Sequence, residues 1–139
     1  MMKLLISLLF LLTSTFAVTL NKAENFAEAQ AQAQAENKRI MVLITQDNCR
    51  YCKRMKKTTF KDPEIIKRIH KDYIFVEVDR YFDEYPEDLT VYGVPTTYFL
   101  YNDAKHIMRG AGGYWGSEDF HSFMDDADKK VKKKLNKKQ

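Results

Sequence analysis

The pattern of apolar and polar positions divides the chain into strands and helices. Residues 40–45 form an almost unbroken apolar run, which is typical of a central strand covered by helices on both faces. Residues 73–78 are rich in β-branched and aromatic side chains and predict a second strand. The runs 96–101 and 106–109 flank the connecting residues 102–105 and predict an antiparallel hairpin. The chain is therefore expected to be an α/β protein with a mixed sheet.

Helices are expected before, between and after these strands. Residues 23–38 are almost all strong helix formers, although Ala and Gln alternate through part of the segment. A further helix is expected to start at Asp62 and Pro63, because Asp is a favoured N-cap and Pro fits the first helical position. Pro86 predicts the start of a short helix. Ser117 is expected to cap a last helix, after a flexible Gly-rich loop.

The two cysteines, Cys49 and Cys52, lie between the first strand and a strongly basic helix. Unpaired N–H groups and the positive end of the helix dipole stabilise a thiolate at a helix start. Such cysteines have pKa values of roughly 3.5 to 7.5 instead of ~8.5. We expect Cys49 to be the nucleophile and Cys52, one turn further, to be the more buried resolving thiol. Arg50 adds a positive charge and Tyr51 adds bulk, so both are expected to tune the redox potential.

The cysteine pair has three other interpretations. A zinc or copper site normally needs four ligands, and the three histidines, His70, His106 and His121, are far apart in the sequence. A purely structural disulfide would close so small a loop that it would constrain the unfolded chain very little. Covalent haem attachment is excluded, because it requires His directly after the second cysteine and Lys53 stands there. Redox chemistry is favoured, and the metal and structural interpretations stay open.

The chain of 139 residues, 45% of them hydrophobic, can bury one modest core. Its first residues give a basic start and the apolar run 4–12, which is too short to span a bilayer comfortably. This pattern predicts a signal peptide, 1–17, cleaved after Ala17, and an uncleaved anchor is the alternative. The mature protein would comprise one domain, 18–128, and a lysine-rich tail, 129–139, in the periplasm or outside the cell.

The positive charge of the chain is concentrated at its C-terminal end. The formal net charge is +4, and the segment 129–139 contains seven lysines, so the rest of the mature chain is net negative. Such a run can touch anionic lipid or nucleic acid. An exported chain rarely meets nucleic acid, so no nucleic-acid partner is expected. We expect the segment to be a solvated, fraying C-terminus.

Several short motifs follow the spacing of a known family. They are Cys52-Lys53-Arg54-Met55, Thr59-Phe60, Asp62-Pro63-Glu64, Gly93-Val94-Pro95-Thr96 and the Gly-rich loop before the last helix. With these motifs, nearly the whole mature chain resembles the thioredoxin superfamily, and most of all its exported thioredoxin-like members. The resemblance implies a central mixed sheet flanked by helices. It also implies that Pro95 is cis and lies beside the cysteines, where the Val94 backbone is free to pair with an extended substrate.

The chain departs from the family pattern at three positions. Asn48 replaces the Trp that commonly precedes the first cysteine, Leu43 stands where many thioredoxins have a buried acid, and Phe75 stands where a lysine is frequent. The proton acceptor for the resolving thiol is then missing, or is supplied by Glu77 or a water. These departures weaken the case for a fast general reductase.

Two aromatic residues in the Gly-rich loop have two interpretations. Tyr114 and Trp115 form an apolar rim for substrate, or a ring from this pair packs on the last helix.

The sequence thus predicts a thiol-disulfide oxidoreductase that acts on protein disulfides outside the cytoplasm, as a reductase or exchange enzyme. It would need no metal and no cofactor beyond the redox-active disulfide Cys49–Cys52. Its partners would be disulfide-containing proteins and a membrane or soluble thiol electron partner, and it would be a monomer. The alternative is a non-catalytic binding module of the same fold, or a metallochaperone that uses both thiolates.

Overall fold

A computed structural model describes residues 17–138, so the predicted signal peptide lies outside the described residues except for Ala17. Its strands form a four-stranded sheet in the order β2-β1-β3-β4. They are β1 (Arg39–Thr45), β2 (Tyr73–Asp79), β3 (Thr96–Leu100) and β4 (Ala111–Gly112). The helices are α1 (Phe26–Glu36), α2 (Arg50–Lys57), α3 (Pro63–Asp72) and α4 (Ser117–Asn136), with the short 3-10 helix η1 (Thr59–Lys61) between α2 and α3.

The sheet is mixed, as the sequence predicts. β1 runs parallel to β2 and antiparallel to β3, and β3 runs antiparallel to β4. The C-terminal ends of β1 and β2 and the N-terminal end of β3 therefore meet at one edge of the sheet. The segments that follow β1 and β2 and the segment that precedes β3 gather there. This edge holds the cysteines.

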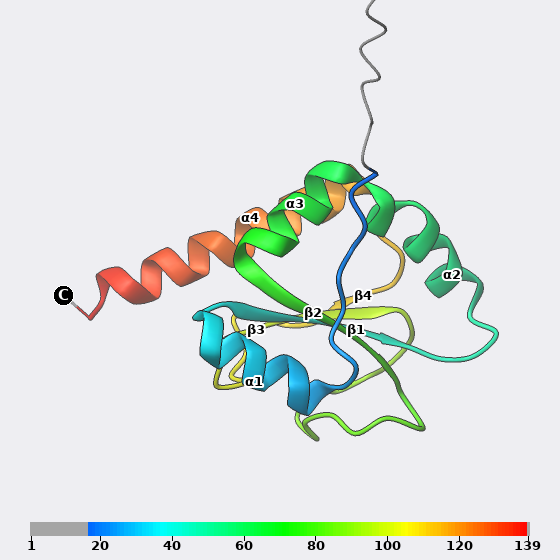
Figure 1. The fold of residues 1–139 in the computed structure, drawn as a ribbon, viewed down its shortest axis with the longest axis horizontal. Coiled ribbons are helices and arrows are strands. Elements are labelled where there is room, and N and C mark those ends of the chain that lie inside the picture. The colour runs from blue at the N-terminus through cyan, green and yellow to red at the C-terminus, as the bar shows by residue number, and fades with distance from the viewer. Residues whose placement is uncertain (1–16, 139) are drawn as a thin grey trace, which may run out of the picture.

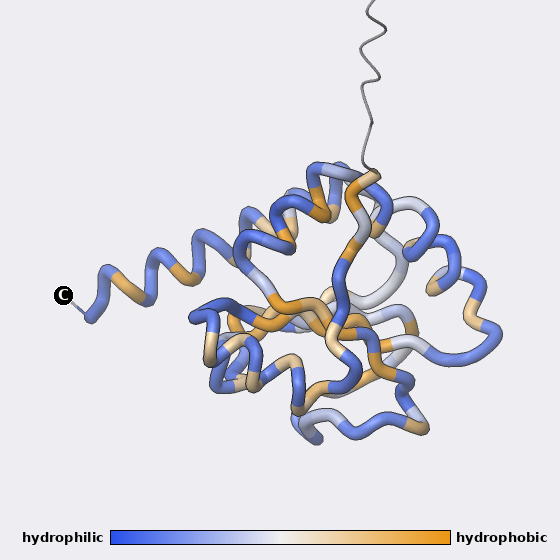
Figure 2. Tube along the Cα trace, viewed as in Figure 1, coloured by the Kyte–Doolittle hydropathy of each residue, from blue (hydrophilic) through white to orange (hydrophobic). Residues whose placement is uncertain are grey.

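Helices cover both faces of the sheet (Figure 1). α1 lies on one face, where Ala29 and Ala33 are fully buried and let the helix approach closely. α2, α3 and α4 lie on the other face, whose core is aromatic and includes Phe60, Phe99 and Phe120. Figure 2 shows the hydrophobic positions concentrated in the strands between these two layers. Burial on both faces explains why the central strand β1 is apolar throughout.

The prediction that residues 106–109 form the second strand of a hairpin is wrong. In the segment 106–109 only His106 forms a bridge, to Leu100, and the next ladder pairs are those of β4, two residues that the sequence assigned to a flexible loop. Residues 107–110 thus face only two residues of β3, so the chain bulges out of the ladder. The Tyr98 ring lies against Gly110, where a Cβ would come within 2.6 Å of it.

The short helix predicted from Pro86 is also wrong. The segment forms turns, with hydrogen bonds from the Leu89 N–H to the Pro86 carbonyl at 3.1 Å and from the Thr90 N–H to the Asp88 carbonyl at 3.0 Å. Tertiary contacts fix this conformation instead, because Leu89 is buried in the core on the α1 face and the Tyr98 hydroxyl donates to the Thr90 carbonyl at 2.6 Å.

Both ends of α1 and both ends of α4 differ from the prediction, and α1 ends at Glu36 instead of residue 38. α1 begins at Phe26 instead of residue 23, because Ala23 forms a parallel bridge with Val76 beside β2. The N-cap of α4 is Gly116, and Ser117 is its first helical residue. α4 also continues to Asn136, so most of the lysine-rich segment is helical. Within residues 17–138, no helix is long and apolar enough to cross a membrane.

Candidate functional site

Cys49 and Cys52 lie at the start of α2 and are joined by a disulfide, with their Cα atoms 5.2 Å apart. Cys49 is the N-cap of the helix, and its Sγ accepts a hydrogen bond from the Cys52 N–H at 3.1 Å. Cys49 is partly exposed, whereas Cys52 is only 2% exposed. The two cysteines are therefore unequal, because Cys49 is accessible from solvent and Cys52 is almost fully buried.

The turn from β1 into α2 depends on Asn48, which the sequence shows only as a departure from the family pattern. Asn48 has φ 56°, in the left-handed region that Asn tolerates better than most residues. It directs the chain so that Cys49 becomes the N-cap. Arg50 and Tyr51 then begin the helix at the surface, where the Tyr51 side chain is 52% exposed. Both predicted tuning residues thus adjoin Cys49 in the chain and face solvent.

The segment before β3 lies directly against the disulfide. The Val94–Pro95 peptide bond is cis, as the resemblance implies. The carbonyl oxygen of Val94 lies 3.8 Å from the Cys49 sulfur. Pro95 is buried, and its carbonyl accepts a hydrogen bond from the Gly113 N–H at 2.7 Å. The fold therefore brings Cys49, Cys52 and Val94 together, although 45 residues separate Cys49 from Val94.

The helix that follows Cys49 is strongly basic. α2 carries five basic side chains in eight residues: Arg50, Lys53, Arg54, Lys56 and Lys57. Arg54 lies over the Tyr114 ring, 4.5 Å from its centroid, and the Tyr114 hydroxyl is 3.2 Å from the Thr58 hydroxyl. Tyr114 thus packs beside α2. Trp115 instead packs edge to face on Phe123 of α4, which favours the interpretation that a ring from this pair packs on the last helix.

Glu77 is the carboxylate that the sequence suggests as a substitute proton acceptor for the Cys52 thiol. It lies on β2 opposite Leu43 of β1 and is 16% exposed. Lys56 pairs with it at 2.6 Å and Lys22 at 3.3 Å. Burial by itself raises the pKa of Glu77, but the hydrogen bonds and charges of the two lysines outweigh burial and hold that pKa below its ordinary value.

Glu77 and Cys52 line the same polar cavity of about 430 Å³. Lys56 and the carboxylates of Asp79 and Asp83 also contribute to its wall. Cys52 and Glu77 therefore border the same solvent-accessible space. The sequence alone did not indicate this cavity, because its walls come from the ends of β1 and β2 and from α2.

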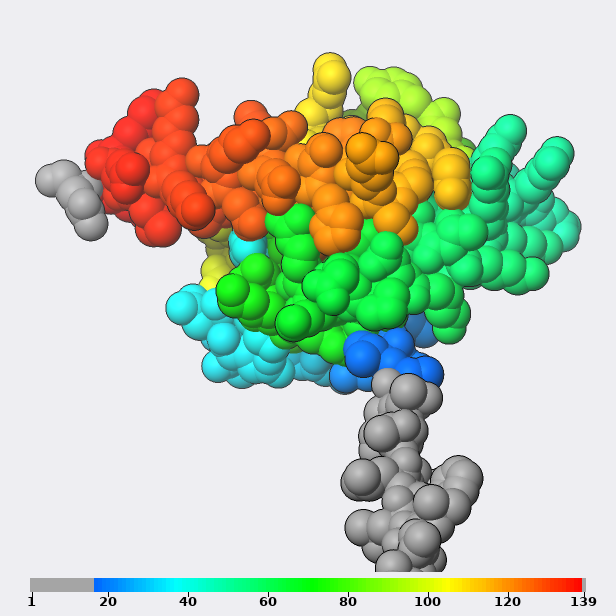
Figure 3. Space-filling view, turned by 90° about the horizontal axis from the view of Figure 1, so that it is seen from above, coloured from blue at the N-terminus to red at the C-terminus, as the bar shows by residue number. Residues whose placement is uncertain are grey.

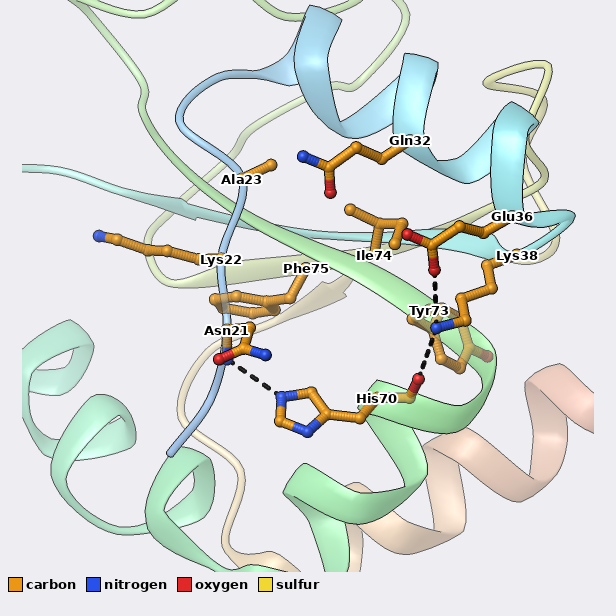
Figure 4. Close-up of a pocket in the computed structure, with 10 residues that line it drawn as sticks. All are labelled: Asn21, Lys22, Ala23, Gln32, Glu36, Lys38, His70, Tyr73, Ile74 and Phe75. Carbon is orange, nitrogen blue, oxygen red and sulfur yellow. Dashed lines mark hydrogen bonds and ion pairs between the residues drawn. The ribbon is translucent and has the colours of Figure 1, made fainter. Parts of the chain in front are cut away.

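A second cavity, of about 290 Å³, lies away from the cysteines (Figure 4). The N-terminal segment 21–23 forms one side, and the Nε2 atom of His70 accepts a hydrogen bond from the Asn21 N–H at 3.0 Å. His106 pairs with Asp88, and His121 lies against Arg68. Across residues 17–138, no group of three or more His, Cys, Asp or Glu side chains is arranged to hold a metal ion.

Comparisons with known proteins agree on the fold. A family model described as "Thioredoxin-like domain" matches residues 26–128. Among solved structures, a DsbH oxidoreductase has 23% identity and a TM-score of 0.65, over 80% of this chain and 85% of that chain. A thioredoxin from Thermus thermophilus has 24% identity and a TM-score of 0.58, over 81% and 87%.

The oxidised C-terminal domain of DsbD from Neisseria meningitidis has 17% identity and a TM-score of 0.59, over 73% of this chain and 90% of that chain. No curated protein sequence matches the chain. At identities below 25%, these structural similarities show only that the fold is shared. They confirm the predicted fold class, a mixed central sheet flanked by helices.

Proposed function

Because the chain belongs to the thioredoxin-like domain family, we infer that it is a thiol-disulfide oxidoreductase that acts on protein disulfides through Cys49 and Cys52. One observation carries this proposal: a partly exposed cysteine caps a helix and is bonded to a second cysteine that is 2% exposed. In the reduced protein the N-terminal N–H groups of α2 would stabilise the Cys49 thiolate. Cys52 would then be protected from any partner other than Cys49.

The reduction of a substrate proceeds in two exchanges. The Cys49 thiolate attacks one sulfur of the substrate disulfide, forms a mixed disulfide and releases a substrate thiolate, which takes up a proton. Cys52 then loses its proton and attacks the Cys49 sulfur. This second exchange releases the other substrate thiolate and forms the Cys49–Cys52 disulfide. Two electrons pass from the cysteine pair to the substrate, and the reverse sequence transfers a disulfide to a substrate dithiol.

The proton of Cys52 needs an acceptor for the second exchange. The family's usual acid is replaced by Leu43, so we assign this role to Glu77, acting through water in the cavity that both residues line. Lys56 and Lys22 keep Glu77 ionised, and an ionised carboxylate can accept a proton. Because its pKa is lowered, Glu77 is a weaker base than a carboxyl group with a raised pKa would be. This weaker base agrees with exchange or slow reduction better than with fast general reduction.

A substrate segment would lie across the surface formed by Cys49 and the Val94 backbone. Val94 would pair with the extended segment by strand addition, with the buried Pro95 fixing its position. Two exposed aromatic side chains adjoin this surface in the chain: Tyr51, which is 52% exposed, and Tyr92, which is 95% exposed. Exposed rings of this size provide apolar area for a substrate that is at least partly unfolded.

We place this activity outside the cytoplasm. The basic start and apolar run of residues 1–17 support export. In an oxidising compartment, net reduction requires a partner that returns electrons to the pair, and a membrane or soluble dithiol protein is the class that fits. The protein would act as a monomer.

Insulin reduction by dithiothreitol and equilibration with glutathione test the proposal. Cys49→Ser should abolish exchange, because no accessible thiolate remains. Cys52→Ser should still attack substrates but accumulate mixed disulfides, since nothing resolves them. Ala31→Ser, on the exposed face of α1, is the matched control and should keep wild-type turnover.

Two results would overturn the assignment. If alkylation of the reduced protein at mildly acidic pH labels Cys52 before Cys49, the nucleophile is misassigned. If the purified protein carries stoichiometric zinc or copper and shows no turnover, the chain is a metal-binding member of the fold instead of an oxidoreductase.

A further inference from the structure

The last turns of α4 differ from the rest of the helix. Its first half is fixed to the body by the buried side chains of Phe120, Met124 and Ala127. Asp128 adds an ion pair with Arg39 at 2.6 Å. No residue of the described chain is buried after Ala127. The end of the helix projects past the body, as the red segment in Figures 1 and 3 shows.

This projecting end is strongly basic. Seven lysines lie within residues 129–138 and no acidic residue interrupts them. All seven are exposed. Lys129, Lys133 and Lys137 follow one another at four-residue spacing, so like charges lie above one another on one helix face. Such pairs weaken a helix in water, and a surface of opposite charge would relieve the repulsion.

The helix end has a defined position beside the body. The Lys134 ammonium lies 3.8 Å from the centroid of the Tyr101 ring. Val131, Leu135 and Lys138 line a hollow of about 350 Å³ together with residues 101–103. Leu135 is nevertheless 59% exposed, with lysines on both sides of it in the chain.

We propose that the lysine-rich end of α4, residues 129–138, is a docking surface for an anionic lipid bilayer. Clusters of four to eight basic residues next to an apolar side chain are attracted to anionic lipid surfaces. The charges here are all ammonium groups on flexible stems, which suit a diffuse layer of negative headgroups. The helix end has no arginine, whose planar fork recognises individual phosphates and bases. Leu135 can enter the headgroup boundary between the lysine stems.

Docking in this way would leave the redox site free. α2 and the projecting end of α4 lie at opposite ends of the molecule in two perpendicular views (Figures 1 and 3). With the α4 end on a bilayer, Cys49 would face the aqueous phase. The proposal rests on charge and exposure at α4 and is independent of the proposed redox function.

Cosedimentation of the full chain with vesicles tests the proposal. Because the full chain includes the apolar run 4–12, the readout is a difference between vesicles: phosphatidylcholine mixed with phosphatidylglycerol should bind the protein more tightly than pure phosphatidylcholine, and added salt should remove this difference. A variant with Lys130, Lys132, Lys133 and Lys137 changed to Gln should partition at least about tenfold less strongly, since each lysine contributes severalfold. None of these four side chains has a hydrogen bond or ion pair in the described residues.

The matched control changes the same number of lysines elsewhere. Lys57, Lys61, Lys67 and Lys71 are exposed on α2, η1 and α3, and their change to Gln lowers the net charge equally. Residues 1–16 are common to all variants, so the difference between variants isolates α4. The α4 variant should keep wild-type insulin turnover in solution.

Each contrary outcome overturns the proposal. Equal binding losses in both variants would make net charge the cause, and equal binding to neutral vesicles would make it a hydrophobic association. Tighter binding to a DNA oligomer or to polyglutamate than to anionic vesicles would assign the surface to a nucleic acid or to an acidic protein.

Discussion

Two basic regions of this protein have similar composition and different surroundings. α2 carries five positive side chains in eight residues, and its inner face is fixed by Cys52 and Met55, which are almost fully buried. The last turns of α4 carry seven lysines and no buried residue. Two of the five charges of α2 have partners, since Lys56 pairs with Glu77 and Arg54 lies over Tyr114. Within the described residues, two of the seven lysines of the α4 end have partners, Lys129 with Asp126 and Lys134 with the Tyr101 ring.

The difference shows that a basic segment cannot be interpreted from its composition alone. In α2 buried side chains fix the backbone, so its charges stay at constant positions relative to the disulfide. The α4 end has no fully buried residue, and it touches the body only partly, through Lys134 on the Tyr101 ring and through the hollow that Val131 and Leu135 line with residues 101–103. We therefore assign the first region to the redox site and the second to a surface interaction.

The largest expected effect is on the free energy of unfolding and comes from the packing of α2 on the core. Met55→Ala should lower the free energy of unfolding by about 2 to 5 kcal/mol, because Met55 is fully buried and its loss leaves a cavity. Leu135→Ala, on the exposed α4 end, should change it by less than about 0.5 kcal/mol. Urea unfolding of the two variants measures the difference. Similar losses for both would mean that the α4 end is as firmly packed as α2.

A smaller effect on stability is expected when Glu77, the ion-pair partner of Lys56, is replaced. Glu77→Gln should destabilise the protein by about 1 kcal/mol at pH 7, a value discounted for solvent screening because Lys56 is 43% exposed. The pKa of Glu77 is lowered in the folded protein, so its contribution is present above the ordinary carboxyl pKa and is lost as the pH falls through the lowered value. The difference between wild type and variant should therefore shrink below about pH 4.

Urea unfolding of Glu77→Gln and wild type at pH 7 and pH 3 measures this change. Glu84→Gln, at an exposed position without an ion pair in the described residues, is the control and should show no difference at either pH. A Glu77 effect that is equal at both pH values would rule out the carboxylate charge as its cause.

The smallest effect concerns the redox potential. Arg50→Gln removes a positive charge beside Cys49, which destabilises the reduced thiolate form and lowers the potential, by about 15 mV or ~0.7 kcal/mol. Lys137→Gln removes the same charge at the α4 end and should leave the potential unchanged. Glutathione equilibration of both variants compares them. A higher or unchanged potential in Arg50→Gln would contradict the electrostatic role of α2.

The sequence predicted the parts of the molecule whose signals are local. The apolar run of β1, the N-cap Asp62 with Pro63 after it, and the placement of Cys49 at a helix start are all found in the structure. Asp62 accepts hydrogen bonds from two backbone N–H groups, as its position predicts. Each of these features depends on neighbours in the chain, which the sequence displays directly.

The errors lie where distant residues decide the local structure. The turns after Pro86 are held by the burial of Leu89 and by Tyr98, and the bulge before β4 places Gly110 on the Tyr98 ring. The cavity shared by Cys52 and Glu77 likewise joins residues from separate elements. Propensity favoured a helix from residue 23, but pairing of Ala23 with β2 outweighed it. The pairing of Ala23 with Val76 and the cavity shared by Cys52 and Glu77 join residues that are too far apart in the chain for a local pattern to reveal.

The bridge between Ala23 and Val76 has a consequence for the behaviour of the protein at high concentration. β2 is an outer strand, and unpaired backbone groups along an outer strand can bind the strand of another chain and begin aggregation. The Ala23 N–H donates a hydrogen bond to the Phe75 carbonyl at 2.9 Å, and the Asn21 N–H donates one to the Nε2 atom of His70. Lys22 adds a charge at the same edge through its pair with Glu77. This short N-terminal segment therefore shields the outer strand from other molecules, and its integrity sets how well the folded protein resists self-association.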